Sequence, residues 1–188
     1  IDFTDMQNVL ALSLGLESFR GKPGEKYSEG QFAFLNCPSV SKTDWHPFTI
    51  SSAPHDKYLT FHIRIGKNQT SWTRRVRDYL RKMAVHGETF VELNRRNEGG
   101  VIVPGKLTAI SGLPFFHVYG PCSAPTQHIS EYNEVMICAS GIGVTPLASC
   151  MKEIVFHKWK MFQGHCFPDR AHFFWICSHR DINSFRWF

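Results

Sequence analysis

The sequence has no long apolar run. No stretch of its 188 residues approaches the roughly 18 to 20 consecutive apolar residues that a membrane-spanning helix needs. Its first residues also lack a basic segment followed by an apolar one, which is the pattern of a secretion signal. These two absences predict a soluble segment in which neither membrane insertion nor secretion is encoded.

Paired cysteine motifs are absent as well. The six cysteines include no C-x-x-C pair, and most of them stand beside apolar residues, as small core side chains do. This pattern favours reduced thiols in a cytosolic setting, and it predicts no metal site.

Charge is sparse and nearly balanced. The 21 Lys and Arg residues exceed the 16 Asp and Glu residues, which gives a net charge of +5 and a mild preference for anionic ligands. The one dense basic group, residues 74–82, has Val76 and Leu80 at the spacing of an inward helix face. Nucleic-acid binding is not predicted, because it would require a concentrated basic face interleaved with aromatic residues.

What the chain does contain is enough apolar material for a packed core. Hydrophobic residues make up 43% of it and aromatic residues 14%. A chain of 188 residues can therefore form one large domain or two small ones.

The most informative stretch is residues 45–54, WHPFTISSAP, which combines polar and aromatic residues: His46, Phe48, Thr49, Ser51 and Ser52. Pro47 has no N–H to donate to a sheet ladder, so we expect an edge strand or a barrel rim, where a ligand can replace a missing neighbour. Alternation places Phe48, Ile50 and Ser52 on one face, and Pro47, Thr49 and Ser51 on the other. A polar edge strand that binds nothing is the alternative interpretation.

Other segments predict further barrel strands. Residues 9–16 and 32–35 are weakly alternating or apolar, and residues 59–65, LTFHIRI, alternate cleanly between the two faces. Arg64 lies on the open face of this last strand, next to His62. Two interpretations are open: a solvated strand arginine, or an arginine that makes a bidentate contact with a phosphate.

A helix is expected over residues 71–83, opened by Ser71, Trp72 and Thr73. A hydroxyl at a helix start caps free N–H groups, and those groups also attract anions. A plain cap and a phosphate-binding helix end are both compatible with this pattern. Residues 84–108 show no sustained periodicity and are predicted to be a loop insertion. A strand over 114–119 then runs into Gly120 and Pro121.

The last third of the chain predicts a strand, a glycine turn and a helix. A buried strand over 134–139 precedes a helix that extends to about residue 158. The turn that joins them reads Gly141, Ile142, Gly143, Val144, Thr145 and Pro146. Its glycines permit close backbone approach, and the free N–H groups of the first helical turn can hold a pyrophosphate.

A second buried strand is expected over 172–177, followed by Ser178 and Arg180. In a doubly wound sheet, ligands gather at the carboxyl ends of the strands, where Arg180 could recognise an adenosine 2′-phosphate. A capped helix start at this position is the alternative interpretation.

Taken together, the segments HPFTISSAP, HIRI with SWT, GP, CASGIGVTPLAS and WICSHRDINSFRWF resemble, in order and spacing, the dehydrogenase region of NADPH oxidases. The calcium-regulated type within the ferric reductase and ferredoxin-NADP reductase superfamily is the most similar. The resemblance implies a β + α/β fold. A six-stranded antiparallel FAD-binding barrel would occupy residues 1–122, and an incomplete Rossmann-like NADPH-binding domain would occupy residues 123–188.

The resemblance also implies two sets of site residues. Thr49 would lie near the flavin N5 as the catalytic contact. The FAD site would comprise His46, Pro47, Phe48, Thr49, Ser51, Ser52, His62, Ile63, Arg64, Ser71, Trp72 and Thr73. The NADPH site would comprise Gly141, Ile142, Gly143, Val144, Thr145, Pro146, Ser178 and Arg180.

The activity implied is electron transfer. NADPH would give a hydride to FAD, which would pass single electrons to membrane haems that reduce oxygen to superoxide; the chemistry would belong to the cofactors. The partners implied are a haem-carrying transmembrane domain of the same full-length chain and a calcium-binding module. This segment would lie at the cytosolic face of a membrane.

Two features depart from the family pattern. Cys122 and Ser123 replace the usual aromatic residue and glycine after Gly120-Pro121, and the chain stops at Phe188 inside the expected helix, so we expect a fragment. Two alternatives stay open. One is the dehydrogenase module of a ferric or other metal-ion reductase, and the other is a regulatory domain that has lost its cofactors.

Overall fold

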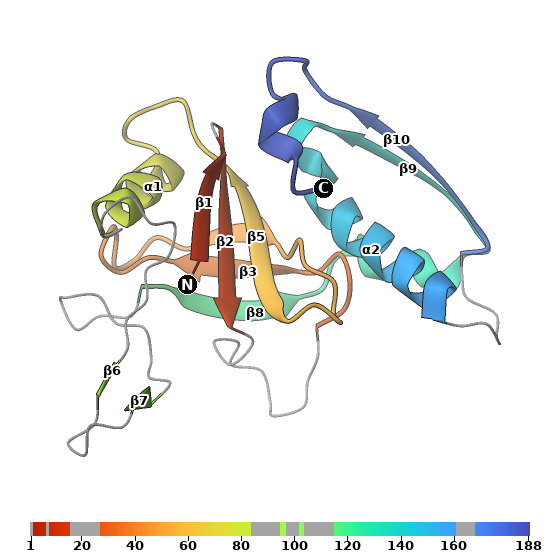
Figure 1. Cartoon of the computed structure of the whole chain (residues 1–188), viewed down its shortest axis with the longest axis horizontal. Helices are drawn as coiled ribbons and strands as arrows, with labels where there is room; N and C mark the ends of the chain where they lie inside the picture. The colour runs from red at the N-terminus through yellow and green to blue at the C-terminus, as the bar shows by residue number, and fades with distance from the viewer. Residues whose placement is uncertain are drawn as a thin grey trace.

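The computed structural model describes residues 2–6, 8–15, 27–83, 95–96, 102–103, 115–160 and 168–188. These residues form two parts (Figure 1). Two antiparallel sheets and helix α1 make up the first part, and two parallel strands with helix α2 make up the second. No strand pairing among the described residues joins the two parts.

The first sheet has the strand order β1-β2-β5, with β1 over Asp2–Met6, β2 over Val9–Gly15 and β5 over Tyr58–Arg64. All its pairings are antiparallel. Alternate side chains of β2 and β5 are fully buried, as the period-2 pattern of 59–65 predicts. Strand β1 was not predicted.

The second sheet has the order β4-β3-β8, with β3 over Phe32–Asn36, β4 over His46–Thr49 and β8 over His117–Cys122. Strand β4 lies at the edge, which confirms the expectation from Pro47. Strand β8 begins three residues later than the predicted 114–119 strand and extends through a cis Gly120-Pro121 peptide bond.

The strands of the two sheets cross each other steeply, and α1, Trp72–Met83, lies beside them (Figure 1). The helix buries Trp72, Val76 and Leu80 in the core between the sheets, which confirms its predicted inward face. Such a core supplies most of the stability of an amphipathic helix.

The predicted closed six-stranded barrel is not confirmed. The six strands form two three-stranded sheets, which meet where the Ser51 N–H donates to the Thr60 carbonyl at 2.9 Å. Among the described residues, no continuous ladder closes the sheets into a barrel. The chain leaves its pairing with β3 after Thr49 and turns inward, so a local bridge replaces a strand pair.

In the second part, β9 spans Glu134–Ser140 and β10 spans Arg170–Ile176, and the two strands pair in parallel. They are joined through the 3-10 turn Gly141–Val144 and helix α2, Thr145–Lys160. This arrangement confirms the predicted strand, glycine turn, helix and strand. A 3-10 turn over Ile182–Phe185 follows β10.

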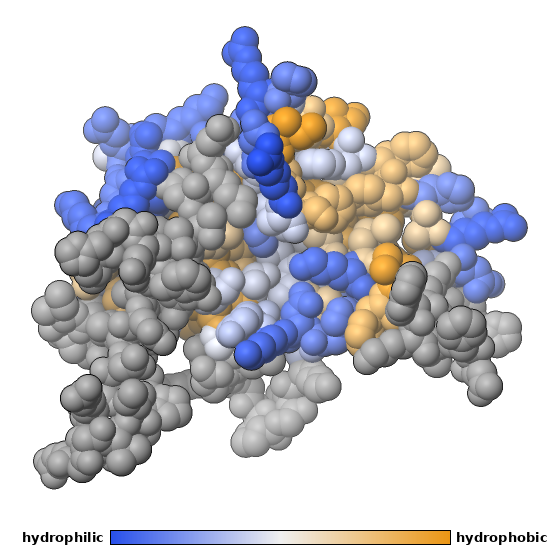
Figure 2. Space-filling view, in the orientation of Figure 1, coloured by the Kyte–Doolittle hydropathy of each residue, from blue (hydrophilic) through white to orange (hydrophobic). Residues whose placement is uncertain are grey.

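Helix α2 runs along β9 and β10 (Figure 1), while Met136, Phe174 and Ile176 point to solvent. Hydrophobic side chains are therefore visible at the surface over this part of the molecule (Figure 2). One face of the parallel pair is exposed and the other is half-buried, apart from the buried Ile137, so the prediction that both strands are buried, as parallel strands usually are, is wrong.

Within the predicted loop insertion 84–108, the structure describes two short strands, β6 over Arg95–Arg96 and β7 over Ile102–Val103. They pair antiparallel, and the other residues of this insertion lie outside the described part. Before β9 comes a 3-10 helix, Pro125–Glu131. No helix in the described ranges is long and apolar enough to cross a membrane.

Candidate functional site

An aromatic cluster joins the edge strand β4 to the start of α1. His46 and Phe48 are alternate residues of β4, so both point to the side on which Trp72 lies. The His46 ring centroid lies 4.6 Å from that of Trp72, and Phe48 stacks on Trp72 at 5.8 Å with an interplanar angle of 23°. The structure therefore brings two predicted flavin residues of β4 together with a third from the start of α1.

Three polar atoms in this region are buried and have no hydrogen-bond partner among the residues that the structure describes. They are His46 Nε2, Ser71 Oγ and Trp72 Nε1. A buried polar group that lacks a partner costs about 1 to 3 kcal/mol, so native proteins rarely retain one without a reason. Among the described residues, Ser39, Tyr79, Ser184 and Trp187 also carry such an atom, so what distinguishes this region is that three of these atoms lie within one cluster of predicted ligand residues.

The start of α1 is packed tightly. The Gly66 N–H donates to Thr73 Oγ1 at 2.9 Å, which engages one predicted flavin hydroxyl within the protein. A Cβ at Gly66 would lie 2.4 Å from Ser71 Oγ, so this close approach requires glycine. The helix start thus holds Ser71 in place, with its hydroxyl oxygen buried against Gly66.

Thr49 and Pro47 lie on the opposite side of β4 from His46 and Phe48. Thr49 is half-buried and pairs with Phe32, while Pro47 is exposed and pairs with Phe34. The predicted alternation therefore extends as far as Thr49.

Beyond Thr49 the predicted alternation is wrong. Ile50, Ser51 and Ser52 are all fully buried. Ser52 Oγ accepts the Thr60 N–H at 3.0 Å and lies 2.8 Å from the Tyr27 hydroxyl. The chain turns into the core here. The hydroxyls of Ser51 and Ser52 therefore both form hydrogen bonds within the protein, and they do not point alternately to a ligand and to the core.

Ser51 belongs to the same internal network. Its Oγ lies 2.7 Å from Nδ1 of His62 and 3.1 Å from Thr60 Oγ1. The His62 ring stacks on Trp187, with centroids 3.6 Å apart and an interplanar angle of 13°. Burial lowers the pKa of His62 to about 3, so the ring is neutral at pH 7. Ile63, another predicted flavin residue, lies in the core.

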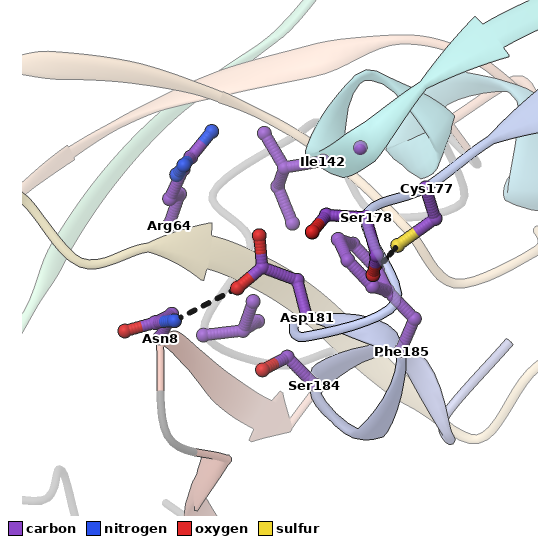
Figure 3. A pocket seen from close by; sticks show the side chains of 10 residues that line it. Asn8, Arg64, Ile142, Cys177, Ser178, Asp181, Ser184 and Phe185 are labelled. Carbon is purple, nitrogen blue, oxygen red and sulfur yellow. Dashed lines mark hydrogen bonds between the residues drawn. The ribbon is translucent and has the colours of Figure 1, made fainter.

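Arg64, at the end of β5, lies beside residues predicted for the nicotinamide nucleotide. One pocket between the two parts of the molecule brings Arg64 together with Gly141, Ile142 and Ser178 (Figure 3). The other residues that line it are Asn8, Val9, Cys177, Asp181, Ser184 and Phe185. The Arg64 side chain is exposed and makes no hydrogen bond or ion pair to the described residues.

Asn8 and Asp181 form a wall of this pocket that the sequence did not predict. The Asn8 side-chain amide donates to Asp181 Oδ1 at 3.0 Å, and this bond links the two parts of the molecule (Figure 3). A single Asn in a turn and an Asp in a predicted cap carry no motif, so only their proximity in space identifies them.

The glycine turn after β9 is open, as its residue types predict. Gly141 has φ +49°, a left-handed conformation that favours glycine, and apart from chain neighbours no atom of the described residues lies within 4 Å of a Cβ built at Gly141 or Gly143. The Thr145 hydroxyl is engaged, since it donates to the Ile142 carbonyl at 3.0 Å. Val144 is buried and anchors the turn, and Pro146 lies in the first turn of α2.

Ser178 and Arg180 follow the carboxyl end of β10 and are both exposed. Within the described part of the chain, the Arg180 guanidinium has no hydrogen-bond or ion-pair partner. Its charge is therefore available to an anion at the end of the sheet where the glycine turn also lies.

The chain matches a family model and several curated proteins. A family described as FAD-binding domain matches residues 7–137. The heavy chain of a superoxide-generating NADPH oxidase from Dictyostelium discoideum is 36% identical over 163 residues, with 87% of this chain and 28% of that protein covered. Respiratory burst oxidase homolog protein B from Oryza sativa subsp. japonica is 34% identical over 195 residues, with 96% of this chain and 20% of that protein covered. NADPH oxidase 1 from Mus musculus is 31% identical over 181 residues, with 96% of this chain and 24% of that protein covered.

Solved structures with a similar fold include the ferredoxin-NADP+ reductase from Plasmodium falciparum. The TM-score is 0.54 at 14% identity, over 99% of this chain and 63% of that one. Its H286L mutant gives a TM-score of 0.52 at 16% identity, over 99% of this chain and 62% of that one. At these identities the likeness shows the fold alone. The chain spans 28% or less of the length of the three curated relatives named above.

Proposed function

The chain belongs to the family of FAD-binding domains, and from this premise we propose that it is the part of an oxidoreductase that transfers electrons from NADPH to FAD. Its curated relatives include superoxide-generating NADPH oxidases. Because the chain covers only part of those proteins, the activity of the whole protein belongs to the proposal.

The observation that carries the proposal is the set of unpartnered polar atoms around the β4–α1 cluster. The imidazole, indole and hydroxyl groups of His46, Trp72 and Ser71 can all donate hydrogen bonds, as the carbonyl and phosphate oxygens of a flavin nucleotide require. The helix start at Ser71 adds N–H groups that favour a phosphate. The residues present therefore fit FAD.

Within this site, each residue would have a limited role. Phe48 would pack against the flavin ring, Thr49 would place its hydroxyl near N5, and Arg64 would contact the pyrophosphate. The other predicted FAD residues would support the site by packing or through their backbone: Pro47, Ser51, Ser52, His62, Ile63 and Thr73. When bound, FAD supplies the acceptor for a hydride that leaves NADPH, which becomes NADP+.

The glycine turn would hold the pyrophosphate of NADPH. Gly141 and Gly143 leave room for it, and Ile142, Val144, Thr145 and Pro146 shape the turn that presents the N–H groups of α2. Ser178 and Arg180 would recognise the adenosine 2′-phosphate at the carboxyl end of β10.

In the whole protein, we propose that the electrons pass singly to haems in a membrane part of the same chain and reduce oxygen to superoxide. This segment would then lie at the cytosolic face of that membrane, and a calcium-binding module would be a further partner. Superoxide formation by the full-length protein, supplied with NADPH, tests this wider proposal. Reduction of ferric ions in place of oxygen would contradict it.

FAD binding is tested by titration of FAD into the chain, followed by flavin fluorescence. A variant with both His46→Ala and Ser71→Ala should bind FAD about 10- to 100-fold more weakly, because it loses contacts worth about 1.5 to 3 kcal/mol. Thr43→Ala is the matched control, since Thr43 is an exposed hydroxyl near β4. Equal affinity of the double variant and the control would contradict the FAD site.

Nucleotide choice is tested at Arg180 in the full-length protein. Arg180→Ala should weaken NADPH binding about 10- to 100-fold and leave NADH nearly unchanged, because only NADPH carries the 2′-phosphate. Arg186→Ala, an exposed arginine of the same segment, is the control. If both nucleotides weakened equally, Arg180 would have a structural role at the turn instead.

A further inference from the structure

Helix α2 contacts the segment that joins β4 to β5, residues 50–57. The Ser149 hydroxyl, which is fully buried, donates to the Ser52 carbonyl at 2.7 Å. The His55 ring stacks on Phe156, with centroids 3.7 Å apart and an interplanar angle of 8°. These contacts join the two parts of the molecule at a place that lies outside the pocket of Figure 3.

A hydrogen bond and an ion pair reinforce this contact. His55 Nδ1 lies 2.7 Å from Glu153 Oε2, and Lys152 Nζ lies 3.5 Å from Asp56 Oδ2. Asp56 in turn accepts the Ala53 N–H at 2.9 Å, which fixes the shape of the segment. The Glu153 side chain is 14% exposed and that of His55 26%, so their pair is partly shielded from water.

Each side of the contact leads directly into one of the two proposed sites. Ser52 lies three residues after Thr49, and Ser149 lies four residues after Thr145, where the glycine turn ends. Four residues of an α-helix span about 6 Å. A short rigid path therefore connects the turn proposed for NADPH with the strand proposed for FAD.

We infer that Ser149 and His55 are positioning residues for hydride transfer, which hold the glycine turn at a set distance and angle from Thr49. This inference rests on the proposed function. Reacting atoms must come within about 3 to 3.5 Å, and a misplacement of about 1 Å can cost about 100-fold in rate. Interfaces between parts of one chain otherwise allow relative motion, so specific contacts are needed to fix the geometry.

Positioning predicts a separation of binding from transfer. Neither Ser149 nor His55 lies in the β4–α1 cluster or lines the pocket between the two parts. Their loss should leave the affinities for FAD and NADPH unchanged and slow the transfer of the hydride. A residue that supported one site alone would change the affinity for one cofactor.

The first measurement is flavin reduction in the full-length protein, loaded with FAD and mixed anaerobically with saturating NADPH. Ser149→Ala and His55→Ala should each slow reduction about tenfold, with both dissociation constants unchanged. His55→Phe keeps the ring stack and should recover part of the rate. The matched control is His172→Ala, which removes an exposed pair in which His172 Nε2 lies 3.1 Å from Glu134 Oε1.

The second measurement is hydrogen exchange without NADPH, which reports the contact independently of activity. Amides of residues 53–57 and of α2 should exchange faster in Ser149→Ala and His55→Ala than in the His172→Ala control. Exchange and reduction rates equal to those of the control would overturn the inference. So would faster exchange with an unchanged reduction rate, which would make the contact purely structural.

Failure of the proposed function would give a different result. The wild-type protein would then fail to bind FAD, or its bound FAD would not be reduced by NADPH, and the positioning inference would fall with it. A different outcome would overturn the positioning inference alone. In it, NADPH reduces the FAD of the wild-type protein normally, but Ser149→Ala and His55→Ala lose NADPH affinity by the same factor as they lose flavin reduction rate.

Discussion

Two polar clusters flank the same strand, and their hydrogen bonding differs. Around Ser51 and Ser52, the hydroxyls bond to Tyr27, Thr60 and His62. Around His46, Ser71 and Trp72, three buried polar atoms have no hydrogen-bond partner in the described part of the chain. The first cluster contributes to the stability of the fold, whereas the second carries a cost that a ligand can remove.

This difference in hydrogen bonding distinguishes polar residues that belong to one sequence motif. In WHPFTISSAP, histidine and serines alike look like ligand groups, because all are polar and surround an aromatic residue. Burial with a partner identifies Ser52 as structural, and burial without one identifies His46 as a candidate for binding. The three predictions that follow test this separation.

The largest expected effect is on stability at Ser52. Ser52→Ala should lower the free energy of unfolding by about 2 to 3 kcal/mol, because the buried Thr60 N–H loses its acceptor and Tyr27 loses a partner. The affinity of the folded protein for FAD should stay unchanged. Urea unfolding measures the first quantity and FAD titration the second. Weaker FAD binding with unchanged stability would reverse the assignment of Ser52.

A smaller effect is expected from the pH dependence of His62. Burial holds its pKa at about 3 in the fold, below the ordinary 6.5, so protons bind the unfolded state more readily between these values. The contribution of His62 to the free energy of unfolding is fully present above pH 6.5 and decreases as the pH falls towards 3. It should decrease by about 2 kcal/mol at pH 5, at 1.36 kcal/mol per pH unit.

The His62→Phe variant keeps a ring against Trp187 and should lack this contribution. Urea unfolding of both proteins at pH 7.5 and pH 5 gives the comparison, in which other groups titrate alike. Equal loss of stability in wild type and variant would mean that His62 is protonated in the folded protein.

The smallest expected effect on stability is at Trp72. Trp72→Phe should change the free energy of unfolding without FAD by less than about 1 kcal/mol, because the lost packing is offset by removal of the unpartnered indole N–H. The same substitution should weaken FAD binding. A loss above about 2 kcal/mol in the absence of FAD would show that the indole is structural, like Ser52.

The resemblance to the dehydrogenase region of NADPH oxidases is confirmed by the family match and by the curated relatives. Strands and helices whose apolar residues repeat at a regular spacing were also predicted correctly. The alternation of 59–65 and the inward spacing of Val76 and Leu80 both appear in the structure. These patterns arise from contacts within one element, which a sequence shows directly.

Other features could not be predicted because they depend on contacts between distant residues. Strand β1 is recognisable only from its pairing with β2. The bond between Asn8 and Asp181 joins residues 173 positions apart, and neither belongs to a motif. The turn of the chain into the core after Thr49 depends on two distant partners of Ser52: the Tyr27 hydroxyl, which lies 2.8 Å from Ser52 Oγ, and the Thr60 N–H, which donates to Ser52 Oγ.

The sequence by itself determined the elements that follow local rules: an edge strand at Pro47, a helix with one apolar stripe, and an open glycine turn before α2. Each depends on the geometry of a proline, a helical period or a glycine. Only the tertiary structure decided which polar groups are free, because hydrogen-bond satisfaction is a property of neighbours in space. For that reason Ser51 and Ser52 are engaged within the protein, whereas His46 Nε2 and Trp72 Nε1 have no hydrogen-bond partner among the described residues.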